Sequence, residues 1–344
     1  MAGKSLPSTA MRFGPYVARA ADKLGAGNFG TVLGATHSRT GERVAIKLET
    51  IDQKRHRLPT EFAIYRELKN QPGFPRVRWF GRAHGHLALV LDLLGPSLRT
   101  IHRESGMTLS TRSVRHVAEQ ALKRLETFHS HGWLHCDVKP ANLLLPRAQA
   151  VASAAAGESS EAGEASKLNG GVLGEDALLN WRRLKSHEPQ GDDGDEWAVD
   201  CPLALVDFGL SRRWLDPETG EHLPAAALPP RRPGAPVGTG RYASLSNHEG
   251  APLSRRDDLE SLAFSLIYLR AGHLPWIGLK PPPASKKERF AAMLECKRET
   301  SLSDLSDGLP SGFEGFLQAV RRLEYGETPD YGALRGMARA WADE

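Results

Sequence analysis

The sequence predicts an α+β fold in which strands come first and helices follow. Two stretches, 20–50 and 84–94, alternate apolar runs with turn-forming residues, as antiparallel hairpins do. The spacing changes at 113–130, where apolar residues recur with a helical period, and the same period returns at 258–270 and 313–323. With 344 residues, the chain is long enough for two lobes. We therefore expect a small antiparallel sheet followed by a larger helical part.

The composition favours a protein that works outside membranes. Hydrophobic residues make up 40% and charged residues 25%, and no run of about eighteen apolar residues occurs. The formal net charge of +4 is too small to indicate a nucleic-acid partner. The three cysteines are widely spaced, which argues against a disulfide framework and a zinc site. We expect a soluble monomer in the cytoplasm, the nucleus or both, with no nucleic-acid or membrane partner.

One long segment, 147–200, interrupts the regular patterns. It is rich in Ala, Gly, Ser and Glu and carries five basic and eleven acidic residues, a net charge of −6, so the rest of the chain carries +10. Such a composition is typical of a disordered acidic insertion. For residues 177–185 within it, two alternatives stay open: a short helix or no regular structure. The predicted organisation is an N-terminal arm at 1–15 and one folded domain at 16–344 that contains this insertion.

The first chemical signal is the segment G-A-G-N-F-G, which contains Gly25, Gly27 and Gly30 and is followed by Val32. Because glycine has no Cβ, backbone amides in such a segment can approach a phosphate closely. A dinucleotide-binding fold would continue with a helix, whereas this sequence continues as T-V-L-G-A-T, which is typical of a strand. We prefer the hairpin interpretation, with the glycine turn over the phosphates of a nucleotide.

The next predicted strand ends with V-A-I-K, in which alternation places Lys47 on the same face as Ala45. A lysine there can reach nucleotide phosphates, although a solvated strand edge is the structural alternative. The segment E-F-A-I-Y-R-E-L has helical character and begins at Glu61, whose carboxylate can pair with Lys47. Glu67 is the competing partner. We prefer Glu61 because Ile64 then faces the core.

The strongest local signal is L-H-C-D-V-K-P-A-N-L-L-L at 134–145. Asp137 supplies an acceptor for a hydroxyl proton, Lys139 a cation for a transferring phosphoryl group, and Asn142 a metal ligand. Farther along the chain, Asp207 leaves an apolar strand directly before a Phe-Gly turn, where a carboxylate can hold a magnesium ion that bridges phosphates. Because these features follow one another in a fixed order, coincidence is a poor explanation.

These features match the protein-kinase signature, and other segments resemble the casein kinase 1 family of serine/threonine protein kinases. The segment L-D-L-L-G-P-S-L at 91–98 is similar to the hinge of that family, and G-T-G-R-Y-A-S-L-S-N-H occupies 238–248, where most protein kinases carry A-P-E. The resemblance implies a bilobal protein-kinase fold. Its N-lobe, at about 16–93, would be a small antiparallel β-sheet with one helix, and its larger helical C-lobe would span about 94–344.

The resemblance also implies roles for individual residues. Asp137 would be the catalytic base and Lys139 the phosphate-directed cation, while Asn142 and Asp207 would bind Mg²⁺. Asp258 would anchor the catalytic loop. The implied ATP-binding residues are Leu24, Gly25, Gly27, Gly30, Val32, Ala45, Lys47, Glu61, Asp92, Leu94 and Leu144. A basic site for protein substrates with acidic or phosphorylated residues would comprise Arg241, Lys286, Lys287 and Arg289, although a solvated charge run is the alternative for the last three.

The chain departs from the kinase pattern at Cys136, which stands where H-R-D has its arginine. Because that arginine commonly meets an activation-loop phosphate, we expect activity that does not need such phosphorylation. We interpret Cys136 as a buried, inert thiol rather than a redox group. We also hypothesise that the acidic insertion competes with acidic substrates for a basic groove. Two other functions stay open: a pseudokinase scaffold with the same fold, and a kinase that acts on small molecules.

Overall fold

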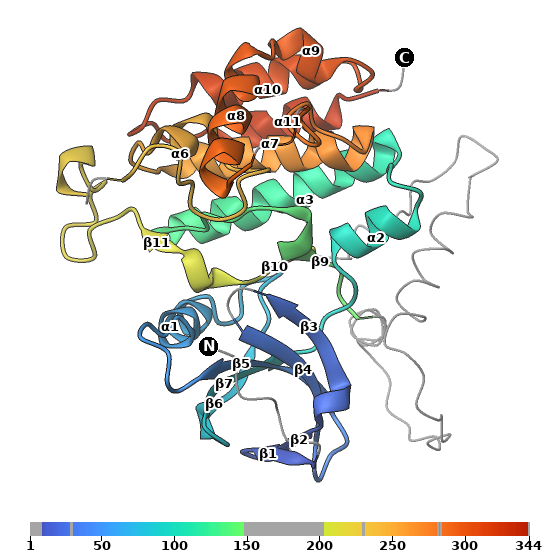
Figure 1. Ribbon diagram of the computed structural model, residues 1–344, viewed down its shortest axis with the longest axis vertical. Coiled ribbons are helices and arrows are strands. Elements are labelled where there is room, and N and C mark those ends of the chain that lie inside the picture. Colours follow the sequence, from blue (N-terminus) through green and yellow to red (C-terminus); the bar gives the residue numbers. More distant parts are fainter. Residues whose placement is uncertain are drawn as a thin grey trace.

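The computed structural model describes residues 9–27, 30–147, 203–228, 231–280, 282 and 284–342. Its two lobes are stacked, with the sheet at one end and most of the helices at the other (Figure 1). This arrangement confirms the predicted α+β architecture. Apart from Arg147, the predicted insertion and its short helix lie outside the described residues. No helix in these ranges is long and apolar enough to cross a membrane.

The smaller lobe contains a seven-stranded sheet in the order β1-β2-β4-β5-β7-β6, with β3 paired to β4. All pairings are antiparallel. The strands are β1 (Met11–Phe13), β2 (Tyr16–Ala18), β3 (Lys23–Gly27), β4 (Gly30–His37), β5 (Arg43–Thr50), β6 (Val77–Ala83) and β7 (His86–Asp92). One boundary differs from the prediction, because Met11 and Phe13 are buried in the core of the sheet instead of lying in an arm. A strand of three residues is too short to show a period in the sequence.

Strand β5 divides its side chains between two environments. Val44, Ile46 and Leu48 are buried in a core on one face of the sheet. Lys47 points to the opposite face, toward α1 (Leu58–Glu67), the one described α-helix of this lobe. The alternation predicted for V-A-I-K is therefore confirmed.

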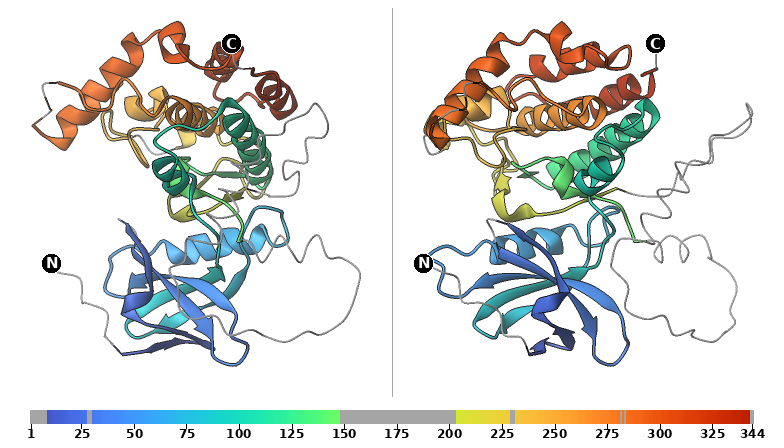
Figure 2. Two further views of the ribbon diagram at one scale, coloured as in Figure 1. Left: turned by 90° about the vertical axis from the view of Figure 1, so that its right-hand side faces the viewer. Right: turned by 45° about the vertical axis from the view of Figure 1, so that its right-hand side comes forward.

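The larger lobe is built around a nearly fully buried helix, α7. It packs against α3, α6 and α10, and the views in Figure 2 show the helices gathered on the side away from the sheet. The helices are α2 (Leu98–Glu104), α3 (Thr111–Ser130), α6 (Leu245–Glu249), α7 (Arg255–Ala271), α8 (Lys286–Glu299), α9 (Leu302–Ser306), α10 (Phe313–Arg322) and α11 (Tyr331–Arg339). Helices were predicted from periodicity at the positions of α3, α7 and α10.

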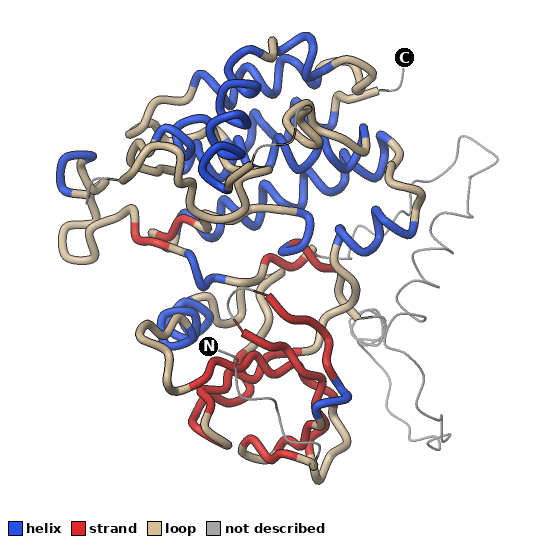
Figure 3. Tube along the Cα trace, in the orientation of Figure 1, coloured by secondary structure: helices blue, strands red, loops and turns tan. Residues whose placement is uncertain are grey.

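Two small antiparallel pairs lie between the sheet and the helices (Figure 3). Strand β8 (Trp133–Leu134) pairs with β11 (Arg212–Arg213), and β9 (Leu143–Leu144) pairs with β10 (Ala204–Leu205). The first pair ends where the segment 135–142 begins, and the second follows that segment directly. Both pairs therefore fix the loop that carries the predicted catalytic residues.

Candidate active site

The glycine-rich segment forms the hairpin that the sequence predicts. Gly27 pairs with Gly30 across β3 and β4, so a strand follows the glycines rather than a helix. Gly30 has a φ of 134°, and a Cβ at this position would lie 2.0 Å from the carbonyl oxygen of Leu48. Only glycine fits there. Gly25 has open space around its Cα, which suits the close approach of a ligand.

Lys47 lies between two carboxylates that come from distant parts of the chain. Its Nζ is 2.6 Å from Oε2 of Glu61 on α1 and 2.6 Å from Oδ1 of Asp207. Glu67 is occupied elsewhere, because it accepts hydrogen bonds from Trp133 and Arg213. The preferred pairing of Lys47 with Glu61 is therefore the one present in the fold.

The three charges of this cluster perturb one another. Burial alone would lower the pKa of Lys47, but the carboxylates of Glu61 and Asp207 raise it, so the amine stays protonated. Burial would raise the pKa of Asp207, yet the charge and hydrogen bond of Lys47 hold that pKa below its usual value. Burial raises the pKa of Glu61 against the attraction of Lys47. The cluster thus places a fixed cation beside an ionised Asp207 carboxylate.

Asp137 lies at the centre of a second cluster. Its Oδ2 accepts a hydrogen bond from Nζ of Lys139 at 2.5 Å, and its Oδ1 accepts one from the backbone amide of Thr239 at 2.8 Å. Lys139 also donates to the Thr239 hydroxyl at 3.0 Å. The side-chain amide of Asn142 donates to the backbone carbonyl of Asp137 at 2.9 Å, which leaves the Asn142 side-chain oxygen free of that bond. The predicted residues of 134–145 therefore converge, with Thr239 as a partner that we did not predict.

The backbone beside Asp137 is held by the buried carboxylate of Asp258 on α7. It accepts hydrogen bonds from the amides of His135 at 2.6 Å and Cys136 at 2.8 Å, and from Nε2 of His129 at 3.0 Å. Burial alone would raise the pKa of Asp258, but the bond from His129 and the nearby charges lower it, so the carboxylate stays ionised. The anchoring role implied for Asp258 agrees with these contacts.

Phe208, the residue after Asp207, connects the two clusters. Its ring centroid lies 4.5 Å from that of Tyr65 on α1 and 5.8 Å from that of His135. The amide of Asp207 donates to the Tyr65 hydroxyl at 3.4 Å, and Nε2 of His135 donates to the carbonyl of Val206 at 3.0 Å. Through these contacts, a displacement of α1 would also shift the loop that carries Asp137.

The order of these clusters along the chain, together with the two-lobed fold, agrees with one known domain. Residues 19–173 match the family model of the protein kinase domain. The fold is the bilobal protein-kinase fold, with the antiparallel sheet in the N-terminal lobe and the helices in the C-terminal lobe. Protein kinase domains use ATP and a divalent metal ion.

Two oxygen donors fit a divalent metal ion. Asp207 offers an ionised carboxylate and Asn142 an amide oxygen, which are hard ligands of the kind that such ions prefer. The backbone carbonyl of Asn142 accepts a hydrogen bond from Val206 at 3.1 Å, so the chain beside Asn142 lies next to the residue that precedes Asp207. Among the described residues, no group of three or more His, Cys, Asp or Glu side chains has the arrangement of a metal site. Any metal here would therefore need oxygen atoms from the nucleotide or from water as well.

The residues predicted to contact the adenine base differ in their exposure and in the contacts of their side chains. Val32, Ala45 and Leu144 are partly exposed, and Leu144 forms a bridge with Ser97 in the segment that joins the lobes. Leu24 is exposed on β3, and Leu94 is half-buried. The carboxylate of Asp92 is bound by the side chains of Arg76 and Arg78, so only its backbone could face a base. The implied role of Asp92 is limited in this way.

The predicted substrate-anion residues lie in two places, the turn 239–243 and the start of α8. The guanidinium of Arg241 lies 5.5 Å from the ring centroid of Tyr268, whereas Lys286, Lys287 and Arg289 are exposed in the first turn of α8. All four side chains are cations, so they cannot pair with one another directly. They are linked indirectly, since the ring of Phe290 covers the glycine before Arg241 and lies 5.4 Å from Nζ of Lys286.

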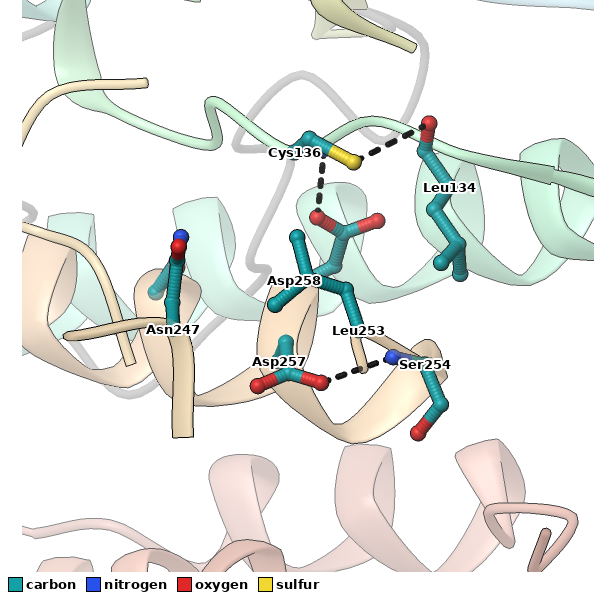
Figure 4. Close-up of a pocket in the computed structure, with 8 residues that line it drawn as sticks. Leu134, Cys136, Asn247, Leu253, Ser254, Asp257 and Asp258 are labelled. Carbon is teal, nitrogen blue, oxygen red and sulfur yellow. Dashed lines mark hydrogen bonds between the residues drawn. The ribbon is translucent and has the colours of Figure 1, made fainter. Parts of the chain in front are cut away.

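The Cys136 thiol faces inward, between the catalytic loop and α7 (Figure 4). Its Sγ donates a weak hydrogen bond to the carbonyl of Leu134 at 3.8 Å, and the space around it is lined by Leu253 and Asp257 among others. Cys136 has a φ of 64°, a left-handed conformation that only a few per cent of non-glycine residues adopt. Burial raises the pKa of the thiol well above its usual range. These features support the interpretation of Cys136 as inert.

We predict that Cys136 resists alkylation in the folded protein. Because the thiolate is the reactive form and its pKa is raised, iodoacetamide near neutral pH should modify Cys136 at least about tenfold more slowly than the partly exposed Cys296. Mass spectrometry of tryptic peptides would give both rates, with the denatured protein as the control. Equal rates in the folded protein would contradict the prediction.

A second prediction separates the two candidate partners of Lys47. Gln at position 61 keeps the shape but removes the charge that holds Lys47, so Glu61→Gln should weaken ATP binding about tenfold, the loss of roughly 1.4 kcal/mol. Glu67→Gln changes the same kind of residue on the same helix and should change the dissociation constant by less than about twofold. Fluorescence titration with a labelled nucleotide would measure both. A larger effect at Glu67 would reverse the assignment.

Proposed function

We propose that this chain is a serine/threonine protein kinase similar to casein kinase 1, which transfers the γ-phosphate of ATP to hydroxyls of acidic or already phosphorylated proteins. The observation that carries the proposal is the pair of contacts on the Asp137 carboxylate, from Lys139 and from Thr239. One partner is a cation in reach of a transferring phosphoryl group, and the other belongs to the segment in which an acceptor protein would lie.

The roles of the residues follow from their contacts. Asp137 accepts the proton of the attacking hydroxyl, and Lys139 offsets the negative charge that gathers on the transferring group. Lys47, fixed by Glu61, binds the nucleotide phosphates, and amides of the glycine hairpin lie above them. Asn142 and Asp207 would hold Mg²⁺, which supplies the charge that neutralises the phosphates. Positioning and electrostatic stabilisation account for the catalysis without a covalent enzyme intermediate.

The remaining features of the proposal concern partners and place. Exposed cations of α8 and the guanidinium of Arg241 would attract acidic or phosphorylated residues near the acceptor. We propose that the protein works as a monomer in the cytoplasm, the nucleus or both, and that nucleic acids and membranes are not its partners. A pseudokinase scaffold remains the rival function, and it is opposed by the complete set of Lys47, Asp137, Asn142 and Asp207.

The transfer reaction gives the decisive test. Wild-type protein with ATP and Mg²⁺ should label casein and an acidic, pre-phosphorylated serine peptide, and Asp137→Asn should lower that rate about a hundredfold or more because the proton acceptor is lost. Labelled γ-phosphate would be followed in both proteins, with nucleotide binding as the control for folding. A wild-type protein that binds ATP but is as silent as the variant would establish the pseudokinase alternative.

The segment between Asp207 and α6 is held by contacts that need no phosphate. The side chain of Asn247 exchanges two hydrogen bonds with the backbone of Val237, at 2.9 and 3.0 Å. The guanidinium of Arg231 donates to the carbonyl of Ala251 at 2.7 Å, and the Tyr325 hydroxyl donates to that of Leu223 at 2.9 Å. These contacts support activity without phosphorylation of this segment.

Phosphatase treatment would test this independence. We expect the treated protein to keep at least about half of its peptide kinase activity, because hydrogen bonds within the protein already hold the segment at Leu223, Arg231 and Val237. Intact-mass measurement would confirm that phosphate was removed. Complete loss of activity after removal, restored by rephosphorylation, would refute the expectation.

A further inference from the structure

The larger lobe contains a lysine with no access to solvent. Lys297, in the last turn of α8, has none of its surface exposed. Its amine donates hydrogen bonds to the carbonyl oxygens of Gly240 at 3.1 Å and Ala243 at 2.5 Å. The same amine lies 4.7 Å from the ring centroids of Phe264 and of Trp276. Four groups that attract a cation therefore surround it.

Burying an ammonium group is costly unless its environment compensates for the lost water. No carboxylate among the described residues forms an ion pair with Lys297. Glu260 on α7, whose charge favours the protonated lysine, is bound to Arg321 at 3.1 Å and to the amide of Leu245 at 3.1 Å. The compensation for Lys297 comes from two backbone carbonyls, two aromatic rings and the charge of Glu260. The lysine is therefore stable in this place only while the segment that carries those carbonyls keeps its position.

That segment is the one that contacts the catalytic aspartate. The amides of Tyr242 and Ala243 both donate to the carbonyl of Thr239, at 2.9 and 3.1 Å, so residues 239–243 form a tight turn. One end of the turn carries Thr239, which binds Asp137 and Lys139. Two other carbonyls of the turn, those of Gly240 and Ala243, accept the hydrogen bonds of Lys297.

We propose that Lys297 is a positioning residue, which uses its charge to fix the turn 239–243 against Asp137 and so sets the site of the acceptor protein. The proposal rests on the proposed protein kinase function. Lys297 does not touch the nucleotide cluster of Lys47, Glu61 and Asp207, so its effect falls on the acceptor and not on ATP.

The charge of Lys297 is also sensitive to pH. Burial lowers its pKa to about 7; the carboxylate of Glu260 and the thiol of Cys296 oppose that shift, and Arg321 adds to it. His248 on α6 also donates to Gly240, at 2.9 Å, and burial together with Lys297 lowers its pKa to about 4, so it stays neutral near pH 7. Lys297 thus loses its charge as the pH rises through about 7, and its attraction to the two rings weakens.

The free energy of unfolding should rise with pH, whereas the attraction of Lys297 to the rings weakens. A lysine whose pKa is about 7 in the folded chain and about 10.5 when unfolded is charged in both states below pH 7, where burial of the charge costs most. Between these values the unfolded chain binds more protons than the folded one. The contribution of Lys297 therefore makes the fold more stable as pH rises from about 7 to about 10, while the grip on the turn weakens.

The test compares Lys297→Met, which keeps the length of the side chain without its charge, with Arg298→Met, which removes the adjacent exposed cation and its pair with Glu249. For Lys297→Met we expect kcat/KM for an acidic peptide to fall about thirtyfold, with the dissociation constant for ATP changed by less than about twofold. Arg298→Met should change neither value by more than about twofold. Equal loss of ATP binding and of peptide turnover, or no loss, would overturn the proposal.

The pH profile provides a readout that a merely structural role would not move. In the wild-type protein, KM for the peptide should rise between about pH 6 and about pH 8.5, and Lys297→Met or Lys297→Gln should abolish that rise. The same profile with Arg298→Met should match wild type. A rise that persists in both Lys297 variants would assign the titration to another group and refute the role of the lysine charge.

Hydrogen exchange tests, without a catalytic assay, whether Lys297 fixes the turn 239–243. After correction for intrinsic rates, amides of 239–248 should exchange faster in Lys297→Met than in Arg298→Met, while those of α3 stay unchanged. Should Lys297→Met not fold, the wild-type protein alone would give the result, since exchange at 239–248 should increase from about pH 6 to about pH 8.5. Unchanged exchange refutes the grip. A wild-type protein that transfers no phosphate, with exchange as expected, would reject only the proposed kinase activity.

Discussion

The catalytic loop depends on the buried carboxylate of Asp258. A carboxylate with little access to water is stable only if its oxygens are satisfied, and here three donors satisfy them: two backbone amides of the loop and the imidazole of His129. In return the loop is held in a conformation it would not adopt freely, since Cys136 has a positive φ. The next residue is Asp137, so its direction is set by this anchor. His129 also accepts from Tyr331 on α11, which extends the anchor to the last helix.

Two strained residues flank the reacting groups. Cys136 and Asp207 are both non-glycine residues in left-handed conformations, with φ values of 64° and 70°. Cys136 directly precedes the Asp137 carboxylate, and Asp207 carries its own. In both residues, tertiary contacts outweigh the conformational free energy that a positive φ costs. For Cys136 these contacts come from Asp258, and for Asp207 they come from Lys47 and Tyr65. Rigid placement of the charges thus originates in the packing around them, which is a form of electrostatic preorganisation.

Features that depend on neighbouring residues could be predicted from the sequence, whereas contacts between distant residues could not. The hairpin at the glycines, the alternation on β5 and the pairing of Lys47 with Glu61 follow from local periodicity and from motif order. Other features leave no local pattern in the sequence, because each depends on residues that are distant in the chain and meet only in the fold. They are the contact of Thr239 with Asp137, the binding of the Asp92 carboxylate by Arg78, and the burial of Lys297. The sequence left a solvated charge run open for Lys286, Lys287 and Arg289 of α8, but it gave no sign that Lys297 in the same helix is fully buried.

The acceptor side of the cleft is built by a different kind of chemistry from the nucleotide side. At the nucleotide side, a lysine is balanced by two carboxylates, and its charge is secure over a wide range of pH. At the acceptor side, Lys297 forms no ion pair with a described carboxylate, and the carbonyls, the rings and the charge of Glu260 do not fully offset burial, so the pKa of Lys297 falls to about 7. His248 donates to the carbonyl of Gly240 in the same turn, and Glu260 accepts from the amide of Leu245 at the start of α6. A site assembled in this way holds the backbone firmly only while the buried amine is charged, so the fold accepts a cost in stability to define where the acceptor lies.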